Sequence, residues 1–172
     1  MSWDYFDQIL YINLPERVDR KTSIKRELQN QNVPPSLITR IEAKPSINGS
    51  RGCALSHILA LDHAKACGYE RFLILEDDVV FLTSAEKTGA YIRQFINFSE
   101  KHPWDLFFLG TSPYRTEPTK DPMIKRVLSS SCAHAYALES RYIDTLRASF
   151  MKSYELLWNR TSFEESFFFA ID

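Results

Sequence analysis

The sequence predicts an α/β domain with a mostly parallel central sheet and helices on both faces. The first observation behind this prediction is that short apolar runs alternate with helical patterns along the chain. The second is the run 72–75, FLIL, which has no polar alternation and is typical of a central strand covered on both faces. Since 172 residues suffice for one core and no linker or repeat interrupts them, we expect residues 1–172 to form a single domain.

Each element follows from its local pattern. Ile24 and Leu28 stand four residues apart, which favours an amphipathic helix. Gly68 suits the end of a helix and Ser140 suits the cap at the start of one. In order, we expect a strand at 9–14, a helix at 16–31, a strand at 37–43, a helix at 53–66, a strand at 72–75, a helix at 84–102, a strand at 104–110, a proline-rich loop at 111–123, a strand at 132–139 and a helix at 140–158.

Three acids interrupt the apolar stretch RFLILEDDVVF at 71–81. In an open α/β sheet, ligands bind beyond the carboxyl ends of strands, where these acids stand. If the strand continued, alternation would point Glu76 and Asp78 together and Asp77 away. Two such carboxylates favour a divalent cation between them. The alternative is a solvated turn or a cap for the next helix, although the turn formers usual there are missing between Leu75 and Leu82.

A second polar segment, NLPERVDR, follows the first expected strand. It supplies Asn13, Arg17, Asp19 and Arg20 at another carboxyl end of the sheet. Arginine suits phosphate groups or a base edge, so this segment could join the same site. An ordinary charged start of a helix explains it equally.

A third segment, GSRGCALSH, precedes and opens the expected helix at 53–66. Free N–H groups at a helix N-terminus favour a phosphate, and Ser50, Arg51 and Gly52 stand there. Ser56 and His57 follow. A histidine in this position is more often structural than catalytic, and that alternative stays open.

Composition and charge exclude several other classes. The formal net charge of −1 gives no global field for nucleic acid. No apolar stretch is long enough for a membrane span, and the N-terminus does not resemble a signal peptide. An odd number of cysteines, three, without a signal sequence favours reduced thiols and a cytoplasmic location. Because we see no export signal, we take the three glycosylation sequons as chance matches.

Taken together, four segments resemble glycosyltransferase family 25, which includes bacterial lipooligosaccharide galactosyltransferases and procollagen galactosyltransferases. They are YINLPERVDRK, RIEAKPSINGSRGCALSHILAL, RFLILEDDVVF and WDLFFLG, in this order between residues 9 and 110, followed more weakly by AHAYALESRYIDTL. The resemblance implies a GT-A fold, a Rossmann-like nucleotide-sugar domain. It also implies a UDP-sugar donor, commonly UDP-galactose, Mn²⁺ (or Mg²⁺) as the metal, and a role such as lipopolysaccharide biosynthesis.

The resemblance also implies roles for residues. Glu76-Asp77-Asp78 matches the family's counterpart of the D-x-D motif, with Glu76 and Asp78 on the metal and Asp77 and Asp78 as catalytic residues. The expected donor-binding residues are Asn13, Arg17, Arg20, Gly52, Ser56 and His57. The family is expected to invert the anomeric centre, which requires a base for the acceptor hydroxyl. Weak candidates for that base are Asp105, Glu164, Glu165 and Asp172.

Family members are usually longer than this chain. We therefore expect either a hexosyltransferase acting on a glycan or other hydroxyl acceptor, or a truncated or degenerate module that binds the UDP-sugar without transfer. A nucleotidyltransferase is a third reading, but no glycine-rich loop follows Leu14. The apolar stretch SFFFAI at 166–171 should pack into the core or form a homo-oligomer.

Overall fold

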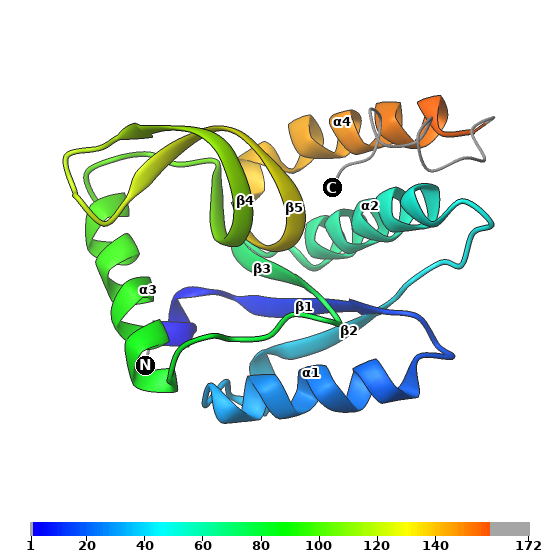
Figure 1. Cartoon of the computed structure of the whole chain (residues 1–172), viewed down its shortest axis with the longest axis horizontal. Coiled ribbons are helices and arrows are strands. Elements are labelled where there is room, and N and C mark those ends of the chain that lie inside the picture. The colour runs from blue at the N-terminus through cyan, green and yellow to red at the C-terminus, as the bar shows by residue number, and fades with distance from the viewer. Residues whose placement is uncertain (1, 159–172) are drawn as a thin grey trace.

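The structure is a computed structural model and describes residues 2–158. One sheet contains five strands in the order β2-β1-β3-β5-β4 (Figure 1). The strands are β1 Gln8–Asn13, β2 Ile38–Glu42, β3 Arg71–Glu76, β4 Leu106–Pro118 and β5 Lys125–Glu139. The helices are α1 Val18–Asn30, α2 Gly49–Cys67, α3 Ala85–Ser99 and α4 Ile143–Leu156, with short 3-10 helices at Ser2–Tyr5, Pro35–Leu37 and Ser140–Tyr142.

The first three strands form a parallel unit. β1 lies between β2 and β3 and pairs with both in parallel, with α1 and α2 as the crossover helices. β5 then pairs antiparallel with β3 on one side and with β4 on the other. The α/β class and the parallel centre are confirmed, and the antiparallel pair β4-β5 extends that sheet on the far side of β3.

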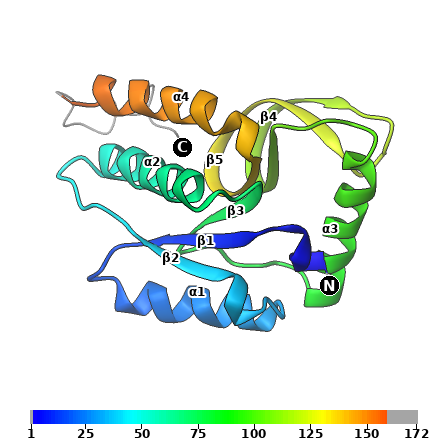
Figure 2. The ribbon, with the colours of Figure 1, turned by 180° about the vertical axis from the view of Figure 1, so that it is seen from behind.

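Helices cover both faces of the sheet, as the sequence predicts (Figures 1 and 2). On one face, Ile24 of α1 and Phe95 of α3 share a core with Leu73 and Leu75 of β3. On the other face, α2 and α4 form a second core with β3. The members of that second core include Ile58, Leu61, Phe72, Ile74, Tyr136 and Phe150. β3 is thus apolar on both sides, which explains its lack of polar alternation.

The prediction of a loop at 111–123 is wrong. β4 and β5 form a long hairpin that contains most of this segment, with irregular register beyond Phe108. Pro113 and Pro118 are tolerated because β4 is the edge strand of the sheet, where a missing N–H costs no ladder hydrogen bond on the open side.

The helix ends correct two further expectations and confirm a third. α2 begins at Gly49 rather than Cys53, because the Asn48 side chain caps it by accepting from the Arg51 N–H at 3.2 Å. Ser140 opens a 3-10 turn and does not cap α4. Gly68 ends α2 in the left-handed conformation, with φ of 72°.

Three expectations concern the ends and the thiols of the chain. Within residues 2–158 no helix is both long and apolar enough to cross a membrane. The three cysteines form no disulfide in this part of the chain. The apolar segment 166–171 and the base candidates Glu164, Glu165 and Asp172 lie outside the described residues.

Candidate functional site

The carboxyl ends of β1 and β3 lie side by side. Ile12 pairs with Glu76 in the parallel register, so the residues that follow both strands meet at one edge of the sheet. Alternation along β3 sets where its first two acids point. Glu76 continues the face of Ile74 toward α2, whereas Asp77 continues the face of Leu75 toward α1. The two neighbouring acids therefore belong to separate polar clusters.

The first cluster surrounds Asp77, which is only 8% exposed. Its two carboxylate oxygens accept from Asn13 Nδ2 at 2.7 Å and from Arg20 Nη1 at 3.1 Å. Asn13 is fully engaged, because the same amide nitrogen donates to the Arg17 carbonyl and its oxygen accepts from Arg40 Nε. A buried carboxylate needs such partners, so this cluster ties the end of β3 to β1, α1 and β2.

Asp78 belongs to the same cluster but is more accessible. β3 ends at Glu76, and Asp77 and Asp78 form a turn, so the strand alternation expected for Asp78 does not continue. The Asp78 carboxylate lies 2.9 Å from Arg20 Nη1 and its side chain is 48% exposed. Arg20 thus contacts both acids of the turn, and this protein cation offsets the repulsion between them.

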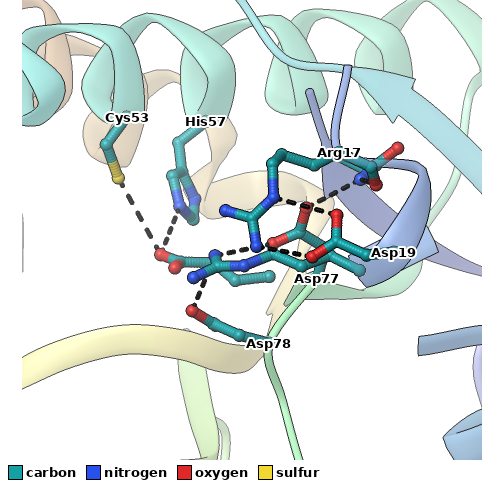
Figure 3. A network of polar contacts seen from close by, with 9 residues as sticks. Arg17, Asp19, Cys53, His57, Asp77 and Asp78 are labelled. Carbon is teal, nitrogen blue, oxygen red and sulfur yellow. Dashed lines mark hydrogen bonds and ion pairs between the residues drawn. The ribbon is translucent and has the colours of Figure 1, made fainter. Parts of the chain in front are cut away.

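Arg17 and Asp19 form a separate surface pair beside this turn. The Arg17 guanidinium donates twice to the Asp19 carboxylate, at 2.9 and 2.8 Å (Figure 3). This fork-on-fork contact holds the pKa of Asp19 below its usual range. Arg17 remains 40% exposed at the edge of the sheet where β1 ends, so its charge faces solvent there.

The second cluster surrounds Glu76. Its Oε1 atom lies 3.3 Å from His57 Nε2 and 3.8 Å from Cys53 Sγ, both from α2 (Figure 3). His57 is fully buried, and its Nδ1 lies 2.9 Å from the Tyr136 hydroxyl of β5. Burial alone raises the pKa of Glu76, but the hydrogen bond and charge of His57, assisted by His134, outweigh it and leave that pKa below its ordinary value.

Gly52 and Ser56 fix the start of α2 against the loop that follows β2. The Ser56 hydroxyl donates to the Gly52 carbonyl at 2.7 Å and accepts from the Lys44 N–H at 3.0 Å. A Cβ on Gly52 would lie 2.8 Å from the Lys44 carbonyl oxygen, so only glycine allows this approach. Ser56 is buried. Both residues therefore hold backbone in place.

A cavity of about 770 Å³ opens beside the acidic turn. Its polar lining includes Glu76, Asp78 and His134, but not Asp77. Its walls are mainly apolar and aromatic, formed by α3, the segment after Asp78 and the β4-β5 hairpin. The size and the mixed polar and apolar lining suit a small-molecule ligand.

Asp105 is placed far from this edge. It precedes β4, where Leu106 pairs with Leu138, and Leu138 in turn pairs with Phe72 near the start of β3. Over the six residues of β3 this is a separation of roughly 15 Å from the acids. Asp105 instead forms an ion pair with Arg141 at 2.7 Å.

The structure brings most of the expected residues to one edge of the sheet, in two clusters that meet at the end of β3. Four further residues of the clusters and the cavity were not predicted from the sequence: Arg40, Cys53, His134 and Tyr136. Only Cys53 carried a signal, because it stands four residues before His57 and so shares a face of the helix.

Polar groups gathered where the parallel strands of an open α/β sheet end mark the place where such sheets bind ligands. The chain belongs to glycosyltransferase family 25 (LPS biosynthesis protein), whose model matches residues 40–156. Among curated proteins it is similar to procollagen galactosyltransferase 1 of Danio rerio, with 25% identity over 65% of the chain. Procollagen galactosyltransferase 2 of Mus musculus is 24% identical over 67% of the chain.

The chain spans 22% of the length of each of these two relatives. A solved structure with a similar fold is a glycosyltransferase involved in the glycosylation of the major capsid of PBCV-1. It superposes with a TM-score of 0.55 at 13% identity, over 91% of this chain and 69% of that one. This likeness concerns the fold alone.

Proposed function

We propose that the chain is a metal-dependent, inverting hexosyltransferase. It transfers a hexose, with galactose as the expected sugar, from a UDP-sugar to a glycan or other hydroxyl acceptor. The observation that carries the proposal is the turn at Asp77 and Asp78, which Asn13 and Arg20 hold at the carboxyl end of the parallel strands beside a cavity. Membership of family 25 supports the reaction class.

The residues at this turn fit a hard divalent cation. Glu76 and Asp78 both line the cavity and offer carboxylate oxygens, the ligands that Mn²⁺ and Mg²⁺ prefer. The partly exposed Asp78 can exchange its contact with Arg20 for a contact with an ion. When bound, such an ion would stabilise the negative charge that develops on the leaving diphosphate.

The basic residues of the same edge suit the diphosphate itself. Arg17 and Arg20 are each more than one third exposed and stand after β1, within reach of a ligand at the strand ends. In contrast, Asn13 and Ser56 are buried and their polar atoms are already engaged. We therefore assign them a positioning role: Asn13 orients Asp77 and its turn, and Ser56 with Gly52 fixes the start of α2.

Calorimetry with UDP and Mn²⁺, beside a transfer and hydrolysis assay, tests the proposal. The donors are UDP-galactose, UDP-glucose and their N-acetyl forms, each with and without Mn²⁺. Asp78→Asn should weaken metal-dependent UDP binding and abolish turnover, whereas Glu86→Gln, an exposed acid on α3, should change neither. Unchanged turnover in Asp78→Asn would contradict the metal assignment. Binding without hydrolysis or transfer would instead favour the module that binds the UDP-sugar without transfer.

A further inference from the structure

A second group of metal-ligating side chains lies behind the acidic turn. Cys53 and His57 stand one helical turn apart on α2 and face Glu76 at the end of β3 (Figure 3). One ligand atom from each of the three lies within 4.8 Å of the other two. Across residues 2–158, no other set of three histidine, cysteine or acidic side chains is gathered so closely. We propose that Cys53, His57 and Glu76 form a binding site for Zn²⁺.

The spacing of the ligand atoms suits a tetrahedral zinc ion. Zn–N and Zn–O bonds are about 2.0–2.2 Å and Zn–S bonds about 2.3 Å, which places two ligand atoms of one ion roughly 3.3–3.6 Å apart. Nε2 of His57 lies 3.3 Å from Oε1 of Glu76, and Sγ of Cys53 lies 3.8 Å from the same oxygen. For these two pairs, binding requires shifts of only a few tenths of an ångström, and the third pair, Cys53 and His57, lies within 4.8 Å.

The ligand chemistry separates this site from the acidic turn. A thiolate and an imidazole select zinc and related transition metals, whereas carboxylates alone select Mg²⁺ or Mn²⁺. The proposed nucleotide metal depends on Asp78, which is not a member of the zinc group. Glu76 is the one residue common to both, but Cys53 and His57 have no role in the proposed function, so the zinc site does not rest on it.

The histidine is already oriented as a zinc ligand. His57 Nδ1 lies 2.9 Å from the Tyr136 hydroxyl, so an Nδ1–H that donates to this oxygen leaves Nε2 to bind the ion. The ring stacks on Tyr136 at 5.7 Å between centroids and meets the edge of Phe150. A buried, packed ring loses little freedom on binding, which favours affinity.

The site has room for a fourth ligand. Three protein ligands plus one open position are typical of zinc sites that bind a water molecule or a substrate atom. Glu76 lines the cavity of about 770 Å³, so the open position is reached from that side. The ion would therefore present its free coordination position to whatever occupies the cavity.

Titration of the chelator-treated chain with Zn²⁺ and with Co²⁺, in the absence of nucleotide, tests the site. We expect one ion per chain and, with Co²⁺, a thiolate-to-cobalt charge-transfer absorption. Cys53→Ser should abolish that absorption and lower zinc affinity by more than about 100-fold, while Tyr136→Phe should lower it by roughly 10- to 100-fold. Cys67→Ser, which removes the exposed thiol at the end of the same helix, is the matched control and should change neither signal.

Several outcomes overturn the proposal. They are no zinc binding by the wild-type chain, no charge-transfer absorption with Co²⁺, or unchanged binding in a folded Cys53→Ser variant. If that variant does not fold by circular dichroism, Cys67→Ser and Cys132→Ser decide together. Loss of the absorption in either would place the thiolate ligand elsewhere, whereas its persistence in both leaves Cys53 as the thiolate. Asp78→Asn should lose UDP and Mn²⁺ binding but keep zinc, so failure of one proposal leaves the other standing.

Discussion

Asn13 and Asp77 are joined by a hydrogen bond of 2.7 Å across 64 positions of the chain. Both side chains are buried. Asn13 is the last residue of β1, and Asp77 directly follows β3. The bond orients the buried Asp77 carboxylate, whereas the neighbouring Asp78 lines the cavity. The accessible part of the acidic turn therefore depends on a buried amide.

Asn13→Ala should destabilise the chain and weaken ligand binding together. The change leaves an Asp77 oxygen and Arg40 Nε without a partner, and a buried unsatisfied group costs about 1–3 kcal/mol. Urea unfolding measures the free energy of unfolding, and calorimetry with UDP and Mn²⁺ measures the binding. Asn30→Ala, at the exposed end of α1, is the control and should leave both unchanged. Loss of binding without loss of stability would show that Asn13 contacts the ligand directly.

Arg20→Met should change metal and nucleotide binding in opposite directions. The substitution keeps an unbranched side chain but removes the cation that Asp77 and Asp78 share. Without this competitor, affinity for Mn²⁺ alone should rise about two- to five-fold, the value of a partly exposed ion pair of roughly 0.4–1 kcal/mol. Affinity for UDP should fall, because one cation of the diphosphate site is lost.

Calorimetry of each ligand separately gives both numbers for Arg20→Met. Arg26→Met, an exposed position on the same helix, controls for the loss of one positive charge. A decrease in Mn²⁺ affinity would mean that Arg20 holds the acids in their binding geometry rather than competing for them.

The sequence predicts that Glu76, Asp77 and Asp78 stand at the end of a central strand, but it does not predict the side chains that contact them. The apolar run of β3 predicts a central strand, and period-two alternation correctly separates Glu76 from Asp77. The same rule fails at Asp78, because the strand ends at Glu76 and Asp77 and Asp78 form a turn. Aspartate is itself a common turn residue, but the apolar residues on both sides of the acids favour a continued strand. Where a strand ends depends on its neighbours in the sheet, which a single segment does not encode.

The local sequence pattern also does not predict contacts between distant segments. Tyr136 fits a strand by its apolar pattern, and nothing local indicates that its hydroxyl meets His57, 79 positions earlier. Arg40 likewise looks like a surface residue of β2 until β1 places Asn13 beside it. The prolines of 111–123 predict a loop, but the open side of the edge strand β4 tolerates Pro113 and Pro118, and Pro122 lies in the turn of the β4-β5 hairpin.

Gly52→Ala should destabilise the chain although alanine favours helices. Its Cβ would lie 2.8 Å from the Lys44 carbonyl oxygen and 3.1 Å from Ser46 Cβ, so the loop after β2 must move. We expect a loss of about 1–3 kcal/mol in the free energy of unfolding, the usual cost of overpacking. Gly49→Ala is a matched control on the same helix, with nothing within 4 Å, and should be neutral or stabilising by up to about 1 kcal/mol. Equal effects of the two substitutions would contradict the close approach at Gly52.

The link between Glu76 and His57 should appear as a pH dependence of stability. The folded-state pKa of Glu76 lies below its ordinary value of 4.5, so the unfolded chain binds this proton more readily. The resulting stability is fully present above pH about 4.5 and is lost as the pH falls through the folded-state value. Glu76→Gln cannot gain or lose this proton, so its deficit relative to wild type should be largest near neutral pH and should shrink in acid.

Urea unfolding of wild type and Glu76→Gln, from about pH 7 to about pH 3 with a chelator present to exclude bound metal, measures that difference directly. Glu70→Gln, an exposed acid just before β3, is the control for removing one carboxylate from the surface. A deficit of Glu76→Gln that stays constant, or grows, as the pH falls would show that the Glu76 carboxylate gains nothing from His57.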